Sequence, residues 1–257
     1  MSRPKASSDI ARPLMAEWVW LPKPRPAAAL RLYCLAHAGA GASVFVSWAA
    51  AAPPEIEIAA IRLPGRETRL DEEPLRRLAP AARSIAELIL RGDARPFALF
   101  GHSLGGRLAV HVASLLEDTD RHPEHLFVSA TPFVPRQRFL HKLDDAAFIR
   151  AIADRFGPLP VQITNDPELL SLFARPLRAD FEALETDHQP PRRLDIALTV
   201  ISGSRDTVVA SSELAGWQEW SSRPLHHDTL DADHFSYRTQ PKEYLGIIRK
   251  HLFEERP

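Results

Sequence analysis

Three residues that together could perform nucleophilic catalysis occur along the chain in the order serine, aspartate, histidine. Ser103 lies in the run GHSLG at 101–105, Asp206 follows an apolar run at 196–202, and His234 ends the run DADH. A serine hydroxyl is a weak nucleophile until a neighbouring base takes its proton, and that base needs an acid to orient it. We therefore expect Ser103 to attack a carbonyl carbon, His234 to be the base and Asp206 to orient the imidazole.

The residues around Ser103 are typical of a nucleophile elbow, in which a strand ends in a sharp turn and a helix begins. FALF at 97–100 predicts a short buried strand, and GRLAVHVASLLE at 106–117 has apolar residues at helical spacing. Gly101 and Gly105 would leave room for the strained turn. A glycine-rich turn with a serine that caps the helix is the alternative interpretation of the same residues.

His234 and Asp206 are chosen by chain order and position, because the chain has 11 histidines. Both follow predicted strands, so they would lie on the same rim of a parallel sheet as Ser103. Asp228, Asp231 and Asp233 are alternatives to Asp206, but they crowd His234 in sequence and would struggle to reach its far nitrogen. The run HHDTLDADH also offers metal ligands, yet it lacks the spacing usual in catalytic zinc sites. We expect neither a metal nor another cofactor.

A second loop could supply backbone N–H groups to the oxyanion that forms during such an attack. HAGAG at 37–41 follows the strand pattern LRLYCLA at 30–36, and its small residues would let amides approach a carbonyl oxygen. In an elbow of this type, the other amide belongs to the residue after the nucleophile. We predict the amides of Ala38 and Leu104 in this role. The alternative for this segment is a plain loop ahead of a helix cap at Ser43.

Short apolar runs alternate with helical patterns, which predicts a mostly parallel sheet covered by helices on both faces. Strands are predicted at 30–36, 56–63, 97–100, 125–130 and 196–202, and helices at 43–52, 74–91, 106–117, 211–220 and 241–253. Residues 135–190 carry helical patterns at 144–156 and 167–184 without a strand pattern. We expect a helical lid there, inserted between the core segments 17–134 and 191–257, and a disordered tail at 1–16.

Length and composition exclude several classes of protein. A chain of 257 residues can bury a core without disulfides or structural metal, and its one cysteine, Cys34, cannot form an intramolecular disulfide. Lys and Arg number 32 against 33 Asp and Glu, which argues against a nucleic-acid partner. No run of about 20 apolar residues predicts a membrane span. The first 28 residues lack the apolar region of a signal peptide, so we expect a cytoplasmic protein.

Taken as a set, these segments resemble the type II thioesterases, the stand-alone editing enzymes of polyketide and non-ribosomal peptide synthesis. The likeness runs from about residue 17 to residue 253, and its most particular parts are LPGRE at 63–67 and LRAD at 177–180. It implies an α/β-hydrolase fold in which Ser103, Asp206 and His234 form the triad. The chain departs from the usual family pattern at positions 36, 39–40, 104 and 232–233, and none of these departures removes a catalytic group.

The resemblance implies hydrolysis of acyl thioesters on the phosphopantetheine arm of an acyl or peptidyl carrier protein, by an enzyme we expect to be a monomer. A carboxylesterase or acyltransferase of the same fold would use the same triad, and a non-catalytic binding module is a further alternative that the intact triad disfavours. Candidate substrate or carrier contacts are His37, His102, Arg66 and Arg107, and Arg62 and Arg69 could also meet an acidic carrier.

Overall fold

A single β-sheet forms the centre of the computed structural model, which describes residues 17–134, 138–188 and 193–254. In these residues the sheet has seven strands in the order β1-β3-β2-β4-β5-β6-β7. All neighbouring pairs are parallel except β1 and β3. The strands are Val19–Trp20, Leu30–Leu35, Ile56–Ile61, Phe97–His102, Leu126–Ser129, Leu198–Gly203 and Leu225–Leu230. The predicted tail at 1–16 lies outside the described residues.

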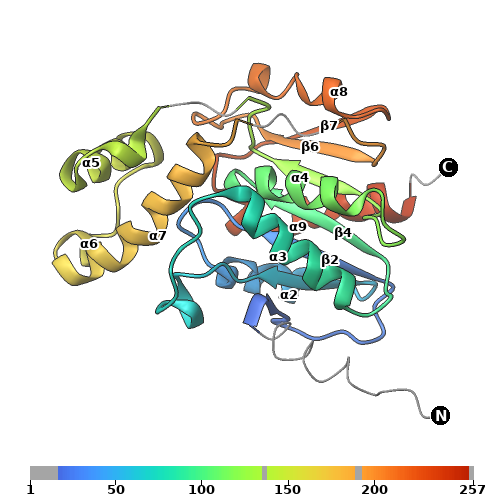
Figure 1. The fold of residues 1–257 in the computed structure, drawn as a ribbon. Coiled ribbons are helices and arrows are strands. Elements are labelled where there is room, and N and C mark those ends of the chain that lie inside the picture. The colour runs from blue at the N-terminus through green and yellow to red at the C-terminus, as the bar shows by residue number, and fades with distance from the viewer. Residues whose placement is uncertain (1–16, 135–137, 189–192, 255–257) are drawn as a thin grey trace, which may run out of the picture.

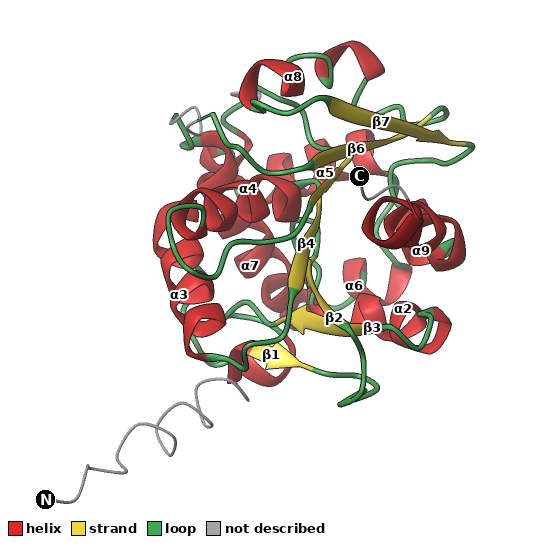
Figure 2. Ribbon diagram, turned by 90° about the vertical axis from the view of Figure 1, so that its right-hand side faces the viewer, coloured by secondary structure: helices red, strands yellow, loops and turns green. Residues whose placement is uncertain are grey.

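Helices cover both faces of the sheet (Figures 1 and 2). On one face lie α3 (Leu78–Arg91) and α4 (Leu104–Leu116), and on the other lie α2 (Val46–Ala51) and α9 (Pro241–Arg249). A short helix, α8 (Trp217–Trp220), precedes β7. This arrangement confirms the predicted mostly parallel sheet between two helical layers.

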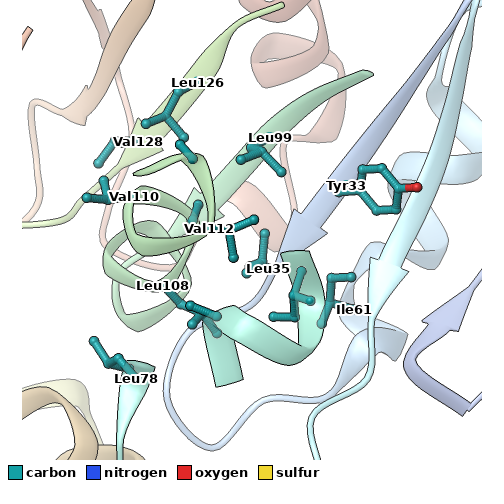
Figure 3. Close-up of a cluster of buried hydrophobic side chains, with 14 of the residues drawn as sticks. Tyr33, Leu35, Ile61, Leu78, Leu99, Leu108, Val110, Val112, Leu126 and Val128 are labelled. Atoms are coloured by element: carbon teal, nitrogen blue, oxygen red, sulfur yellow. The ribbon is translucent and has the colours of Figure 1, made fainter. Parts of the chain in front are cut away.

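The core follows the alternation of side chains along the strands. In β2, Tyr33 and Leu35 belong to the cluster under α3 and α4, whereas Leu32 and Cys34 pack on the opposite face toward α2 and α9. Both faces are therefore apolar, which is why the strands read as continuous apolar runs. Figure 3 shows the cluster on the α3–α4 face, with labelled residues Tyr33, Leu35, Ile61, Leu78, Leu99, Leu108, Val110, Val112, Leu126 and Val128.

Three further helices follow one another between β5 and β6, within the segment predicted as a helical insertion. They are α5 (Asp145–Phe156), α6 (Val161–Thr164) and α7 (Pro167–Glu185), and they stand beside the carboxyl ends of the strands (Figure 1). Residues Phe148 and Ile152 of α5 pack with Leu177 and Phe181 of α7 in an apolar cluster of their own. That these helices act as a lid stays a prediction.

Several element boundaries differ from the sequence expectation. The helix predicted at 43–52 is a 3-10 turn, Ala42–Phe45, followed by α2, and α3 begins at Leu78 rather than at residue 74. The helix after the serine begins at once, at Leu104 rather than at residue 106. In place of a helix at 211–220 there are a 3-10 turn, Ser211–Glu213, and α8. Among the described residues, no helix is both long and apolar enough to cross a membrane.

Candidate active site

Ser103 occupies a strained turn between β4 and α4. Its backbone has φ 55° and ψ −117°, a conformation that residues with side chains rarely adopt. The turn is held by the Ser103 N–H, which donates to the Ser129 carbonyl at 2.9 Å. A Cβ atom on Gly101 would collide with the backbone of Gly105, and one on Gly105 with the backbone of Leu35. The two glycines thus have the spatial role that the sequence predicted.

Asp206 and His234 are brought together from the loops that follow β6 and β7. Asp206 Oδ2 lies 2.8 Å from His234 Nδ1, and the two side chains are 2% and 4% exposed. Asp206 Oδ1 accepts the N–H groups of Val208 and Val209 at 2.7 and 2.9 Å. Burial would raise the pKa of Asp206, but hydrogen bonds from His234 and these amides, with the histidine's charge, lower it below its ordinary value. The carboxylate is therefore ionised and fixed in orientation.

The remaining imidazole nitrogen, His234 Nε2, is buried and has no hydrogen-bond partner among the described residues. His234 and Ser103 both line one cavity of about 430 Å³. The rings of Phe235 and Phe156 lie 5.0 and 6.0 Å from the His234 ring, centroid to centroid. An unpaired buried nitrogen is costly unless a substrate or nucleophile meets it, so its place on this cavity suits a base that acts on Ser103.

The predicted oxyanion amides belong to the loop after β2 and to the first residue of α4, which directly follows the cavity-lining Ser103. Ala38 lines the cavity, and Leu104 is the first residue of α4, where a helix leaves its N–H groups unpaired. The structure records no hydrogen bond from either amide to a described residue. Neither amide is thus paired within the described residues, and their role as an oxyanion hole stays a prediction.

The loop that carries Ala38 is fixed by the two segments most particular to the family resemblance. Asp180 of α7 accepts the Gly39 N–H at 2.7 Å and forms two hydrogen bonds with Arg66, at 2.7 and 2.8 Å. Glu67 accepts the N–H of Ala42 at 3.0 Å. LPGRE and LRAD therefore meet behind the loop at 37–42 and hold it in place.

Arg66 and Arg107 were expected to be substrate or carrier contacts, but the structure buries both guanidinium groups against carboxylates. Arg66 is 6% exposed and paired with Asp180, and Arg107 is 2% exposed with its Nε 2.7 Å from Asp187. Arg69 is likewise buried and paired, with Glu72. Guanidinium groups that are buried and paired with carboxylates cannot reach a carrier surface.

The two histidines expected near the substrate have different environments. His37 lines the cavity, in agreement with a substrate contact. His102 is fully buried, is not part of the cavity wall, and stacks on Tyr237 with ring centroids 4.2 Å apart. Its Nδ1 lies 3.0 Å from Ser129 Oγ, so His102 packs behind the elbow and away from the cavity where a substrate contact was expected.

The side chains of the HHDTLDADH run are turned to separate neighbours. His227 Nε2 lies 3.0 Å from Ser202 Oγ, and Asp228 Oδ2 lies 2.7 Å from His251 Nε2. Within the described part of the chain, no three or more His, Cys, Asp or Glu side chains gather as a metal site would require.

The segment 140–185, which contains α5 to α7 and their connections, supplies most of the apolar wall of the cavity. A hollow of this size and lining suits a hydrocarbon-rich ligand. The helical residues that line it include Ile152, Phe156, Ile163, Phe173, Leu177 and Phe181.

Sequence reasoning missed Tyr237, whose hydroxyl lies 2.6 Å from His37 Nδ1. It follows His234 in the run DHFSY, but no spacing rule connects it with a histidine 200 residues away.

A strained serine above a mostly parallel sheet, with an aspartate–histidine pair on the same rim, defines an α/β-hydrolase. Within that class, the chain belongs to the thioesterase family, because the model of the thioesterase domain matches residues 30–252. Solved structures agree. The type II thioesterase YbtT of the yersiniabactin pathway is 28% identical with a TM-score of 0.81, covering 91% of this chain and 98% of that one. RedJ, the thioesterase of the prodiginine pathway in Streptomyces coelicolor, is 30% identical with a TM-score of 0.79, covering 96% and 95%.

Curated relatives point to the same family. The gramicidin S biosynthesis protein GrsT of Aneurinibacillus migulanus is 32% identical over 82% of this chain and 84% of its own length. Thioesterase PikA5 of Streptomyces venezuelae is 33% identical over 83% of this chain and 78% of its own length. The chain also matches the synthetase AmbE of Pseudomonas aeruginosa with 33% identity, but spans only 10% of that much longer protein.

Proposed function

We propose that the protein is a stand-alone editing thioesterase that releases acyl groups from the phosphopantetheine arm of acyl or peptidyl carrier proteins, in polyketide or non-ribosomal peptide synthesis. The observation that carries this proposal is that His234, hydrogen-bonded to Asp206 through Nδ1 and with Nε2 unpaired among the described residues, lines the same cavity as Ser103. The names of GrsT, a gramicidin S biosynthesis protein, and of YbtT, a type II thioesterase of an NRPS/PKS pathway, support the choice of substrate, and PikA5 is named as a thioesterase.

In the acylation step, His234 Nε2 takes the proton of Ser103 Oγ while the oxygen bonds to the thioester carbonyl carbon. The amides of Ala38 and Leu104 donate to the oxyanion that forms. As the oxyanion collapses, the carbon–sulfur bond breaks and the thiolate takes the proton back from His234. A thiol with a pKa near about 8.5 is a good leaving group. One amide of this kind contributes about 10²–10³ in rate.

Hydrolysis of the acyl-serine repeats these steps with water as the nucleophile. His234 takes a proton from the water, the same amides hold the second oxyanion, and Ser103 Oγ leaves with the proton. Throughout, Asp206 keeps the His234 proton on Nδ1 and stabilises the imidazolium that forms twice in each cycle. The steps use only side chains and amides of this chain.

Helices α5 to α7 form the wall that receives the acyl group in this proposal. Their apolar residues enclose the cavity next to Ser103, and we propose that the segment 135–190 acts as a lid that keeps water from the acyl chain. The carrier would be a transient partner, and we propose that the enzyme acts as a monomer in the cytoplasm.

A serine-directed fluorophosphonate tests the nucleophile. We expect it to label the wild type and the control Ser114→Ala, a serine on the same helix α4 that does not line the cavity, but not Ser103→Ala. Labelling of folded Ser103→Ala at the wild-type rate would refute the assigned nucleophile. An unlabelled wild type would favour the non-catalytic alternative.

A panel of acyl groups, loaded on cognate and foreign carriers and followed by mass spectrometry, tests the substrate. We expect release from carriers to exceed cleavage of the oxygen ester of the same acid. Rapid cleavage of simple esters without release from any carrier would refute the carrier thioesterase and favour a carboxylesterase. Transfer of the acyl group to an added alcohol, in place of hydrolysis, would favour an acyltransferase.

A further inference from the structure

His37 lies in the loop after β2 and contacts the 3-10 turn Ser236–Arg238, which follows His234 in the sequence. Its Nδ1 lies 2.6 Å from the hydroxyl oxygen of Tyr237, whose side chain is fully buried. Among the described residues, Nδ1 of His37 is the only acceptor that the structure records for this hydroxyl. This contact holds one edge of the imidazole ring against Tyr237.

This contact determines which nitrogen of His37 carries the proton. A buried hydroxyl proton needs an acceptor, and Nδ1 is the acceptor recorded for Tyr237, so the phenol donates to a bare Nδ1. Burial raises the pKa of Tyr237, so the phenol keeps its proton. Burial also lowers the pKa of His37 to about 3, with help from the positive charges of Arg238, His234 and Arg66. At neutral pH His37 is therefore an uncharged imidazole with Nδ1 bare and Nε2 protonated.

The protonated Nε2 edge of the His37 ring is the edge turned away from Tyr237, on the side of the cavity. His37 lines the cavity, and with Nδ1 turned onto Tyr237 the opposite edge carries Nε2. The structure records no hydrogen bond from that nitrogen to a described residue, nor is it among the described polar atoms that are buried without a partner. The ring is next in sequence to Ala38 and packs on Phe235, with centroids 4.9 Å apart.

We propose that His37 is a neutral hydrogen-bond donor to a carbonyl oxygen of the substrate, and that Tyr237 is the positioning residue that fixes the imidazole tautomer for this role. The proposal rests on the proposed function, because the substrate is taken from it. A neutral donor suits a thioester substrate, since it binds a carbonyl oxygen without placing a second cation beside His234.

Two carbonyl groups of a carrier-bound substrate are candidates for accepting this hydrogen bond. One is the thioester carbonyl, whose oxygen becomes negative during attack, and the other is an amide carbonyl of the pantetheine arm. Loss of a donor to the oxyanion lowers the rate by about 10²-fold or more. Loss of a neutral hydrogen bond to an amide lowers kcat/KM by about 10-fold.

Kinetics of two variants test the donor. His37→Gln keeps an N–H near the position of Nε2, whereas His37→Leu removes it, and His226→Gln on the exposed edge of β7 is the control. We expect Gln to retain kcat/KM within a few-fold while Leu loses at least about 10-fold. An acyl-pantetheine and a p-nitrophenyl ester of the same acid separate the sources. If His37→Leu loses kcat/KM with both substrates, the acceptor is the carbonyl under attack, which is the thioester carbonyl in the carrier-bound substrate. If it loses kcat/KM with the pantetheine substrate alone, the acceptor is an amide carbonyl of the arm.

Nitrogen NMR of labelled wild-type protein tests the tautomer without depending on any variant. We expect His37 to show a protonated Nε2 and a bare Nδ1 from pH 5 to 8, and Tyr237→Phe to lose this single-tautomer signature. A proton on Nδ1, or a cationic ring at pH 7, would overturn the proposal, as would equal kcat/KM for the Gln and Leu variants. Failure of the proposed function is distinct, because it would appear as an absence of acyl release from any carrier while the tautomer stayed as assigned.

Discussion

The buried ion pair between Asp180 and Arg66 allows a test of how the structure supports the candidate oxyanion loop. Replacing Asp180 by Ala leaves the Arg66 guanidinium, 6% exposed, without its carboxylate and removes the acceptor of the Gly39 N–H. Removing one partner of a buried pair costs about 3–5 kcal/mol in the free energy of unfolding. In a domain of this size each kcal/mol shifts the melting temperature by about 2–4 °C, so we expect Tm to fall by about 6–20 °C.

A matched control lies two residues further along α7. Glu182 pairs with Arg76 across the same two segments, but these side chains are 31% and 52% exposed. An exposed pair contributes about 0–1 kcal/mol, so Glu182→Gln should lower Tm by less than about 4 °C. Thermal melts followed by circular dichroism measure both variants. Equal shifts for Asp180→Ala and Glu182→Gln would refute the reasoning, because burial would then make no difference.

Three further outcomes are expected. Asp206→Asn should lower kcat by about 10⁴, as loss of the orienting acid does in serine proteases, whereas the exposed Asp231→Asn should stay near wild type in the same assay. For His37, whose pKa is lowered to about 3 by burial and nearby positive charge, the unfolded chain takes up a proton below about pH 6.5 and the folded state does not. Its contribution to the free energy of unfolding should therefore fall by about 1.4 kcal/mol per pH unit on acidification. Urea melts should show that the free energy of unfolding of His37→Gln depends less steeply on pH than that of the wild type. Equal pH slopes for the two proteins would count against a buried neutral ring. Finally, kcat/KM should rise about fourfold for each added methylene until the cavity of about 430 Å³ is filled, and a flat series from acetyl upward would contradict an acyl role for it.

The sequence predicted the parts of the fold that depend on local pattern. Strands buried on both faces read as apolar runs, and the turn at Ser103 follows from a strand, small residues and a helix in succession. The edge strand Val19–Trp20 was not predicted, because its two residues carry no periodicity and are a strand only through pairing with β3. Helix starts were misplaced for a related reason, since Leu104 is helical only because the elbow ends at Ser103.

The candidate site also has parts that local sequence pattern predicts and parts that depend on contacts between distant segments. Chain order and position on the sheet predicted Asp206 and His234, and the structure places their side chains 2.8 Å apart. Arg66 and Arg107 were expected to contact the substrate or an acidic carrier, whereas the structure buries both against carboxylates. Their carboxylate partners lie 114 and 80 residues away in the sequence, and no local pattern indicates which aspartate a buried arginine will meet.

Those same buried pairs bear on how the cavity is built. Asp180 and Glu182 tie the body of α7 to the segment before α3, and Asp187, just past the end of α7, holds Arg107 of α4. Leu177 and Phe181 line the cavity from this anchored helix. Because two buried ion pairs join α7 and the residue just past its end to the core, we expect these pairs to position this wall of the cavity and so to set the width available to an acyl chain. Loosening α7 by Asp180→Ala should therefore weaken the discrimination between acyl chain lengths as well as lower Tm.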